Sequence, residues 1–318
     1  PLVDGVFAAR VAGVYDINNS NDVSNITTGL SDPEDEVSSL RLSAAWQIND
    51  NLKSSFVYQY YDRDTERPAP LQGSDALGLR PTLNASDRVA LGQSNEGATL
   101  EYDLYNLRFD WQLGNLDLVS VTGYSDSTKD SYQENDRANY VTLDGDAFSI
   151  DAAITNQNSL TKAETLSQEI RLSSSGNDFW DWMVGVFYLD QDTETAFASN
   201  RAVAPPLNIS FSSVGAIPVT RDELAFFTFN QFYLSERLTL EAGLRWTEYD
   251  SYRAADVFYG DTNYLPEFLI PIQDIVVGGI SGAFPIIGIS DAYKNTKEDA
   301  VTGSLTLRYN WTEDTTVY

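Results

Sequence analysis

Cysteine and histidine are both missing from this 318-residue sequence, and methionine occurs once. Without cysteine there is no disulfide, no thiol nucleophile and no zinc–thiolate site. Without histidine the chain lacks the commonest general base and the commonest transition-metal ligand. The usual nucleophile–base pairs are therefore absent. No other catalytic motif is evident, so we expect neither an enzyme nor a bound cofactor.

Long hydrophobic runs and basic charge are also scarce. No stretch approaches the roughly 20 unbroken apolar residues of a membrane-spanning helix. Lys and Arg number 20 against 47 Asp and Glu, so the net charge is -27. Nucleic acid is an improbable partner, because phosphate binding needs a basic face. The first residues do not read as a signal peptide, so we expect a mature form or a missing N-terminus.

Aromatic residues, at 12% of the chain, and a period-two pattern are what the sequence has instead. Leu40, Leu42, Ala44, Trp46 and Ile48, for example, alternate with polar or small neighbours. Alternation of this kind is typical of half-buried strands. It recurs at 52–60, 105–111, 166–172, 238–246 and 301–311, and more weakly at 6–15, 116–124, 182–189, 224–234 and from 315. We therefore predict about eleven strands and no helix.

The connections between these segments alternate between short and long. Tight turns are predicted at 49–50, 114–115, 174–178, 235–237 and 312–314, and long connections at 16–36, 62–98, 130–162, 197–221 and 252–297. Loops this long are uncommon in compact soluble domains, but outer-membrane barrels combine short periplasmic turns with long outer loops. The tryptophans near short turns fit an aromatic girdle at a membrane interface: Trp46, Trp111, Trp180, Trp182 and Trp311.

These patterns favour an all-β, transmembrane, antiparallel up-and-down β-barrel over a soluble sandwich or propeller. Lipid is expected to contact the apolar parity of the strands: Leu42, Leu107, Phe109, Leu240, Leu244, Leu305 and Leu307. The most apolar segment, Phe268–Ile289, is interrupted by Pro271 and Pro285. We expect it to be a loop that folds over the barrel mouth or meets a partner.

Several segments resemble the TonB-dependent receptor family. They are Pro1–Asp4 with Ala9–Gly13, Leu118–Tyr124, Leu166–Ser173 followed by Trp182–Leu189, and Leu238–Trp246. Members of this family carry an N-terminal plug domain inside a 22-stranded barrel and a TonB-box peptide before the plug. This sequence shows neither. Residues 1–318 are therefore expected to be a partial barrel domain, with about 11 of 22 strands.

The resemblance implies an outer-membrane receptor of a Gram-negative bacterium that imports a scarce nutrient: an iron–siderophore complex, cobalamin or an oligosaccharide. Its expected partners are the TonB protein of the inner-membrane complex, outer-membrane lipid and lipopolysaccharide, and a small-molecule or metal-chelate ligand. Two alternatives stay open, namely a passive porin-type channel and a surface β-rich binding protein.

Candidate site residues fall into three groups. Five arginines on the polar parity are expected to face the lumen, where they would contact a plug or serve ordinary lumen polarity: Arg41, Arg108, Arg171, Arg245 and Arg308, with Arg10 as a weaker sixth. Ligand contacts are unassigned, with weak loop candidates in Tyr132, Arg137, Tyr140, Arg201, Tyr259 and Tyr264. Two acidic groups, Asp144-Gly145-Asp146 with Asp151 and Asp32, Glu34, Asp35 and Glu36, are interpreted as solvated loops rather than calcium sites.

Overall fold

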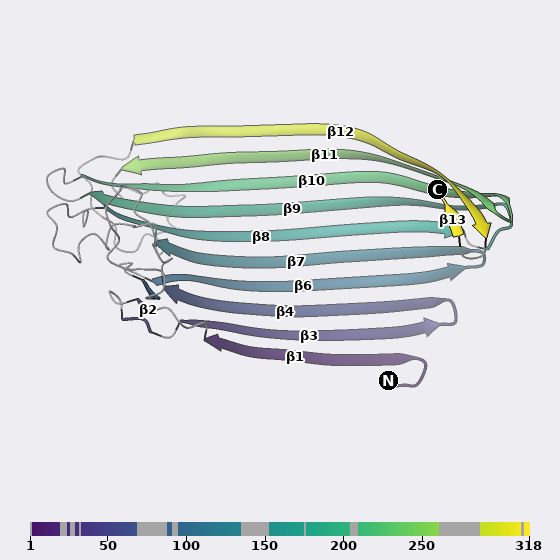
Figure 1. Cartoon of the computed structure of the whole chain (residues 1–318), viewed down its shortest axis with the longest axis horizontal. Coiled ribbons are helices and arrows are strands. Elements are labelled where there is room, and N and C mark those ends of the chain that lie inside the picture. The colour runs from purple at the N-terminus through teal and green to yellow at the C-terminus, as the bar shows by residue number, and fades with distance from the viewer. Residues whose placement is uncertain are drawn as a thin grey trace.

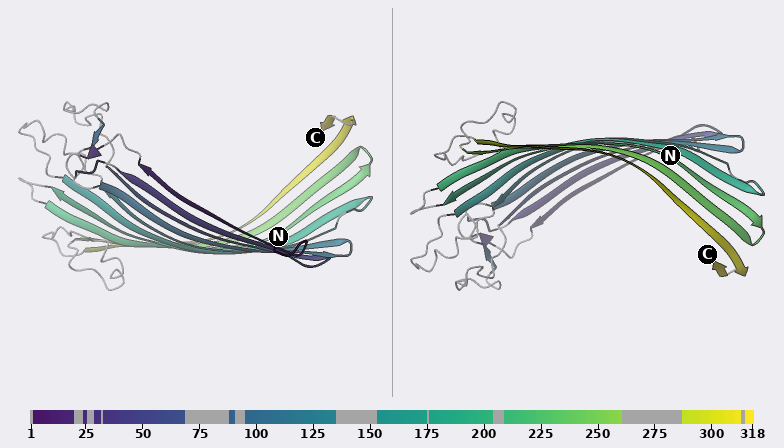
Figure 2. Two further views of the ribbon diagram at one scale, coloured as in Figure 1. Left: turned by 90° about the horizontal axis from the view of Figure 1, so that it is seen from below. Right: turned by 90° about the horizontal axis from the view of Figure 1, so that it is seen from above.

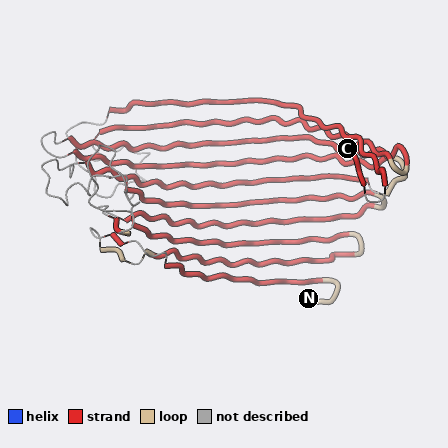
Figure 3. Tube along the Cα trace, viewed as in Figure 1, coloured by secondary structure: helices blue, strands red, loops and turns tan. Residues whose placement is uncertain are grey.

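The computed structural model describes residues 2–19, 24–25, 29–31, 33–68, 88–90, 95–134, 153–174, 176–203, 209–260, 287–312 and 315–318. All regular secondary structure in these ranges is β-strand (Figure 3). No helix long and apolar enough to cross a membrane occurs in the described ranges.

One antiparallel sheet of eleven strands dominates the structure, and its strands pair in chain order (Figure 1). Its strands are β1 (Phe7–Asn19), β3 (Glu34–Asn49), β4 (Leu52–Pro68), β6 (Asn95–Leu113), β7 (Leu116–Glu134), β8 (Ala153–Ser174), β9 (Trp180–Val203), β10 (Ile209–Ser235), β11 (Leu238–Gly260), β12 (Ile287–Thr312) and β13 (Thr315–Val317). The predicted up-and-down meander is confirmed. A separate two-stranded parallel ladder, β2 (Ser24–Asn25) with β5 (Val89–Ala90), was not predicted.

Every short turn that the sequence predicted joins two adjacent strands of this sheet. Gly114 between β6 and β7, and Gly176 between β8 and β9, have φ angles of 66° and 77°. Side chains other than glycine are strained in this left-handed region, so glycine suits both turns. All these turns lie at the same end of the sheet, hereafter the turn end; the opposite end is the loop end (Figure 1).

The strands are longer than the sequence predicted, and this corrects the assignment of the long connections. β10, for example, begins at Ile209, and β12 begins at Ile287. Both starts lie inside stretches that were expected to be loops. Period-two alternation requires one apolar face. Toward the loop end of β10 apolar residues occupy both parities, with Val214 and Ala216 on one and Ile217 and Val219 on the other, so the alternation disappears although the hydrogen-bonded ladder continues. Most of the predicted apolar loop Phe268–Ile289 lies outside the described residues.

The sheet curves into a trough (Figure 2). Along β8, Lys162, Glu164, Leu166 and Ile170 are exposed, whereas the residues between them are half-buried. Side chains diverge on the convex side of a curved sheet and converge on its concave side. We therefore assign this exposed parity to the convex, outer face and the opposite parity to the concave, inner face.

The register places the apolar residues of successive strands on this outer face. The predicted lipid-facing residues Leu42, Leu107, Phe109, Leu240, Leu244, Leu305 and Leu307 all share it. So do the turn-end tryptophans Trp46, Trp111, Trp180, Trp182 and Trp311. The outer face therefore carries an apolar band with an aromatic margin at the turn end, as the girdle at a membrane interface requires.

A carboxylate ends the apolar band at its other margin on each strand, from Glu36 on β3 to Asp299 on β12. Glu36 shares its cross-strand row with Asp291, and Asp299 lies eight residues nearer the turn end. At standard strand dimensions, this slip is about 26 Å along the strands over about 38 Å across the sheet. The margin is thus inclined by about 35° to the cross-strand rows. This angle matches the tilt of the strands in a membrane barrel.

Three polar residues within the apolar band form hydrogen bonds with one another. The hydroxyl of Thr122 donates to Gln168 Oε1 over 2.5 Å, and Gln168 Nε2 donates to Ser120 Oγ over 3.0 Å. Unsatisfied polar groups are expensive in hydrocarbon. The mutual bonding across β7 and β8 lets these three residues occupy the outer face.

Replacing Leu244 with Arg is expected to destabilise the full-length protein in lipid vesicles by about 2–4 kcal/mol, because the charge would enter the apolar band. Leu244 is 53% exposed on the outer face. The matched control is Ser304→Arg, since Ser304 pairs with Gly243 and faces inward. Denaturant titration measures both variants. Equal folding free energies for the two variants would contradict the assignment of the faces.

Candidate functional site

The five predicted arginines all lie on the inner face. Arg171 on β8 and Arg245 on β11 belong to one cross-strand row, with Gly185 and Phe227 between them. The arginines lie at different levels along the strands. Arg41 is adjacent to Leu40 and Arg245 to Trp246, near the loop-end margin of the apolar band. The guanidinium groups are thus distributed over the height of the inner wall.

Most of these arginines pair with carboxylates of the same sheet face. The ion pairs are Arg108–Asp110 at 2.6 Å, Arg171–Glu169 at 3.5 Å, Arg245–Glu223 at 3.0 Å and Arg308–Glu241 at 3.2 Å. Between 35% and 40% of each of these arginine side chains stays exposed. Because a guanidinium has five donor hydrogens, each can bind a further acceptor that approaches from the concave side.

The most elaborate inner cluster surrounds Glu223 on β10. Its two carboxylate oxygens accept hydrogen bonds from Arg245 Nη2 at 3.0 Å and Arg221 Nη2 at 3.1 Å. The Arg245 guanidinium also lies 5.7 Å from the ring centres of Phe187 and Phe227. Two cations therefore share one carboxylate against an aromatic wall, so the cluster retains a positive charge.

Gly185 leaves room for this cluster. A Cβ atom at this position would lie within 2.3 Å of the Phe227 ring, so any larger residue would displace the ring on which Arg245 packs. Sequence reasoning did not select Arg221 or Glu223. Phe226 lies on the apolar parity of β10. Extending that alternation toward the start of the strand would have placed Arg221 and Glu223 on the opposite, inner parity.

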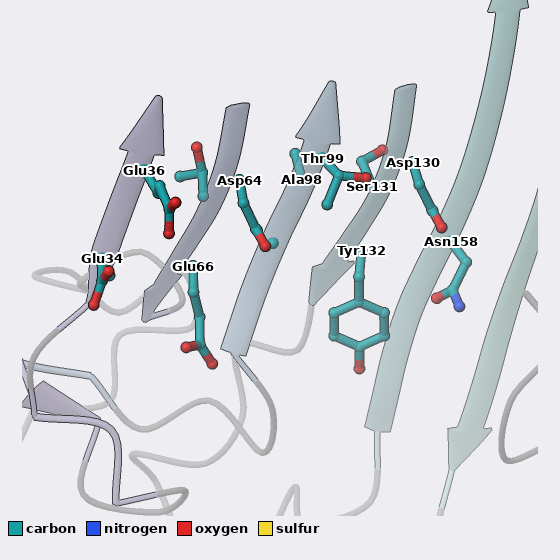
Figure 4. Close-up of a pocket in the computed structure, with 12 residues that line it drawn as sticks. Glu34, Glu36, Asp64, Glu66, Ala98, Thr99, Asp130, Ser131, Tyr132 and Asn158 are labelled. Carbon is teal, nitrogen blue, oxygen red and sulfur yellow. The ribbon is translucent and has the colours of Figure 1, made fainter. Parts of the chain in front are cut away.

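An acidic hollow of about 540 Å³ lies at the loop ends of β3, β4, β6, β7 and β8 (Figure 4). Its charged lining consists of Glu34, Glu36, Asp64, Glu66 and Asp130. The register puts these carboxylates on the outer face, beyond the margin of the apolar band. The hollow is therefore part of the solvated outer surface.

Tyr132 is the one loop candidate whose side chain the structure describes, and it lines this hollow (Figure 4). Arg201 lies in β9 and Tyr259 in β11, but their side chains are outside the described part. Arg137, Tyr140 and Tyr264 lie outside the described residues altogether. The structure therefore does not bring these candidates together.

The acidic residues near residue 34 divide between the two faces. Glu34 and Glu36 line the outer hollow, whereas Asp35 accepts hydrogen bonds from Arg63 Nε at 2.7 Å and Thr65 Oγ1 at 3.0 Å on the inner face. Consecutive strand residues point to opposite faces, so these carboxylates cannot bind one ion together. In the described ranges no group of three acidic side chains is arranged to hold a metal. Asp32, Asp144, Asp146 and Asp151 lie outside them.

Like charges face each other on the outer surface beyond the apolar band. Asp190, Asp222 and Asp250 occupy one cross-strand row on β9, β10 and β11. Burial and the neighbouring carboxylates of Asp190 and Asp250 raise the pKa of Asp222. Where an opposite charge is available, the charged form is favoured instead. The carboxylate of Glu248 is bonded to Lys297 at 2.9 Å and raises the pKa of the Lys297 ammonium group.

The fold and these two faces define part of the wall of a transmembrane β-barrel. Comparison with protein families identifies which barrel. Residues 39–318 match the family model "TonB dependent receptor-like, beta-barrel". The chain therefore belongs to the TonB-dependent receptor β-barrel family, as the sequence resemblance implied.

Solved structures agree with this assignment. The ferric yersiniabactin uptake receptor FyuA of Yersinia pestis superposes over 99% of the chain, with a TM-score of 0.70 and 15% identity. The siderophore receptor PiuA of Acinetobacter baumannii superposes over 98%, with a TM-score of 0.64 and 12% identity. The closed form of the ferric-catecholate import receptor Fiu of E. coli K12 also covers 98%, with a TM-score of 0.60 and 13% identity.

The chain spans 41%, 44% and 45% of those three receptors, respectively. No curated protein matches the sequence significantly. At these identities the superpositions establish the fold.

Replacing Asp222 with Asn is expected to stabilise the full-length protein at pH 7 by about 0.5 kcal/mol, because it removes one of three aligned negative charges. Salt reduces the gain. The native carboxyl has a raised pKa, so its destabilising charge is present above that pKa and disappears as the pH falls through it. The advantage of Asn should therefore shrink toward pH 4.

Urea titrations in lipid vesicles at pH 7 and pH 4 measure this difference. Asp178→Asn, in the turn between β8 and β9, removes an exposed carboxylate outside the acidic row and serves as the control. A gain at Asp222 that is independent of pH would contradict the charge explanation.

Proposed function

We propose that this chain forms part of the barrel wall of a TonB-dependent outer-membrane transporter, which takes up a scarce nutrient in a Gram-negative bacterium. The division of the sheet into two faces carries the proposal. The outer face has an apolar band of the kind that contacts lipid, while the inner face carries ion pairs and exposed guanidinium groups. A wall with this division can hold a polar plug domain within a membrane.

The relatives support the transport class. FyuA is named a ferric yersiniabactin uptake receptor, PiuA a siderophore receptor and Fiu a ferric-catecholate import receptor. We infer a small-molecule or metal-chelate ligand for this protein too. Its further partners would be the TonB protein, which supplies energy from the inner membrane, and the lipid and lipopolysaccharide of the outer membrane.

The inner arginines have a specific role in this proposal. Arg108, Arg171, Arg245 and Arg308 are each paired with a carboxylate and still partly exposed. A guanidinium held in place by one ion pair loses little entropy when it binds a second acceptor. The arginines would therefore bind plug carboxylates or carbonyls with preset geometry.

The full-length protein is expected to be electrically silent in planar lipid bilayers, because its plug fills the barrel. A variant without the plug should conduct steadily. A passive porin would conduct at full length, and a surface binding protein would give no steady conductance in either form. Binding to the purified periplasmic domain of TonB provides an independent measurement. Steady conductance of the intact protein, or no binding to TonB, would overturn the proposal.

Substituting both Arg108 and Arg171 with Ala should increase hydrogen exchange in the plug of the full-length protein, because two anchoring donors are lost. The barrel should still insert, since the apolar band is unchanged. Lys162→Ala with Lys297→Ala removes two cations from the outer face and is the matched control. If plug protection is the same in both double variants, the arginines do not hold the plug.

A further inference from the structure

The inner face of β7, β8 and β9 changes character toward the loop end. Five successive cross-strand rows of inward positions lie there. The first row is Ser125, Thr165 and Gln191, and the fifth, nearest the loop end, is Gln133, Gln157 and Ser199. Every position in these five rows carries a hydroxyl or a carboxamide, except for Ala163, Lys129 and Phe197. We call this area the hydroxyl tract.

The opposite face of the same segments locates the tract relative to the membrane. Asp126, Glu164 and Asp190 are the first outward carboxylates on β7, β8 and β9, and the tract extends from their level toward the loop end. Carboxylates avoid hydrocarbon. The hydroxyl tract therefore lines the part of the wall that rises above the apolar band, where a ligand entering from outside would meet it first.

Charge is segregated between the two faces of these strands. The outer face carries carboxylates at Asp130, Asp192 and Glu194, whereas Lys129 is the one ion in the tract as defined. General lumen polarity does not account for this, because a polar wall in water tolerates charged residues as readily as hydroxyls. The scarcity of ions in the tract is a property of this surface.

The hydroxyls of the tract are held in position but not saturated. Ser131 Oγ and Ser159 Oγ are 2.8 Å apart, and Thr161 Oγ1 and Thr195 Oγ1 are 3.1 Å apart. A hydroxyl can donate once and accept twice. Each pair consumes one donor and one acceptor, so each still offers a donor and acceptors to a ligand.

Two aromatic residues continue the tract sideways. Ser127 pairs with Tyr102 on β6, which pairs with Tyr61 on β4, so the three share one row on the inner face. Both tyrosines are half-buried. A tyrosine offers an apolar ring and a polar hydroxyl, which suits a ligand with apolar faces and hydroxylated edges.

We propose that the hydroxyl tract, with Tyr61 and Tyr102, binds an uncharged, hydroxyl-rich ligand, and specifically a neutral oligosaccharide. Hydroxyls and carboxamides match the alternating donors and acceptors of sugar hydroxyls, and the tyrosine rings pack on the apolar sugar faces. A multiply charged anion would need compensating cations on desolvation, and the tract provides only Lys129. The guanidinium groups at its edges, Arg221 beside Gln191 and Arg63 beyond Tyr61, already bond to Glu223 and Asp35. This inference rests on the proposed function, because it assigns the ligand class of that transporter.

The test uses the full-length receptor purified in detergent, with neutral hexasaccharides of glucose, mannose and xylose as probes. Isothermal titration calorimetry should detect saturable binding of at least one of them. A ferric tris-catecholate complex should not compete. The variant Ser131→Ala, Ser159→Ala, Thr161→Val, Thr195→Val should bind the same sugar at least about tenfold more weakly, and so should Tyr102→Ala.

The matched control is Thr99→Val with Thr128→Val, which removes two hydroxyls from the outer face of β6 and β7 and should leave sugar affinity unchanged. Hydrogen exchange of the barrel strands checks that each variant is folded. The inference is overturned if no hexasaccharide binds the folded receptor. Equal weakening in the control, or competition by the catecholate complex, would also overturn it. Bilayer silence and TonB binding are measured without sugar, so the transporter proposal can stand if this ligand assignment fails.

Discussion

Backbone pairing across a membrane is the constraint on which the rest of this structure depends. No water is available in hydrocarbon, so each peptide group of a spanning strand has to bond to a neighbouring strand. Within the described sheet the strands from β3 to β11 meet this requirement, because each pairs on both sides with its neighbours in chain order. Once the ladder is set, successive side chains necessarily point to opposite sides. All the functional properties of the wall follow from which residue occupies which parity.

The two parities meet different solvents, and their chemistry differs accordingly. The outer parity is apolar from the turn-end tryptophans to a diagonal line of carboxylates, and that line follows the tilt that a closed barrel imposes on its strands. At this line carboxylates even stand opposite one another, as Asp190, Asp222 and Asp250 do. Such repulsion is tolerable only where water and salt screen it, so the acidic rows mark surface outside the membrane.

The chemistry of the inner parity changes along the strands, from the turn end toward the loop end. Within the height of the apolar band it presents arginines that are already paired with carboxylates, an arrangement that suits the fixed surface of a plug. Toward the loop end, on β7 to β9, it presents hydroxyls and carboxamides with tyrosines beside them. Ion pairs favour one permanent partner with matched geometry, whereas neutral hydrogen bonds are individually weak and suit a ligand that has to be released. The gradient is consistent with a wall that captures at its mouth and anchors lower down.

The sequence by itself determined the fold class, the turns and the parity of the apolar band, because these follow from local alternation and from glycines such as Gly114. It also placed Arg171 and Arg245 on the polar parity. It could not show that β10 begins at Ile209, since apolar residues on both parities of its first half leave no period-two signal. Nor could it show that Arg221 and Arg245 share Glu223. Cross-strand register alone brings residues from β7, β8 and β9 into one tract, because pairing depends on how distant segments align and not on any local pattern.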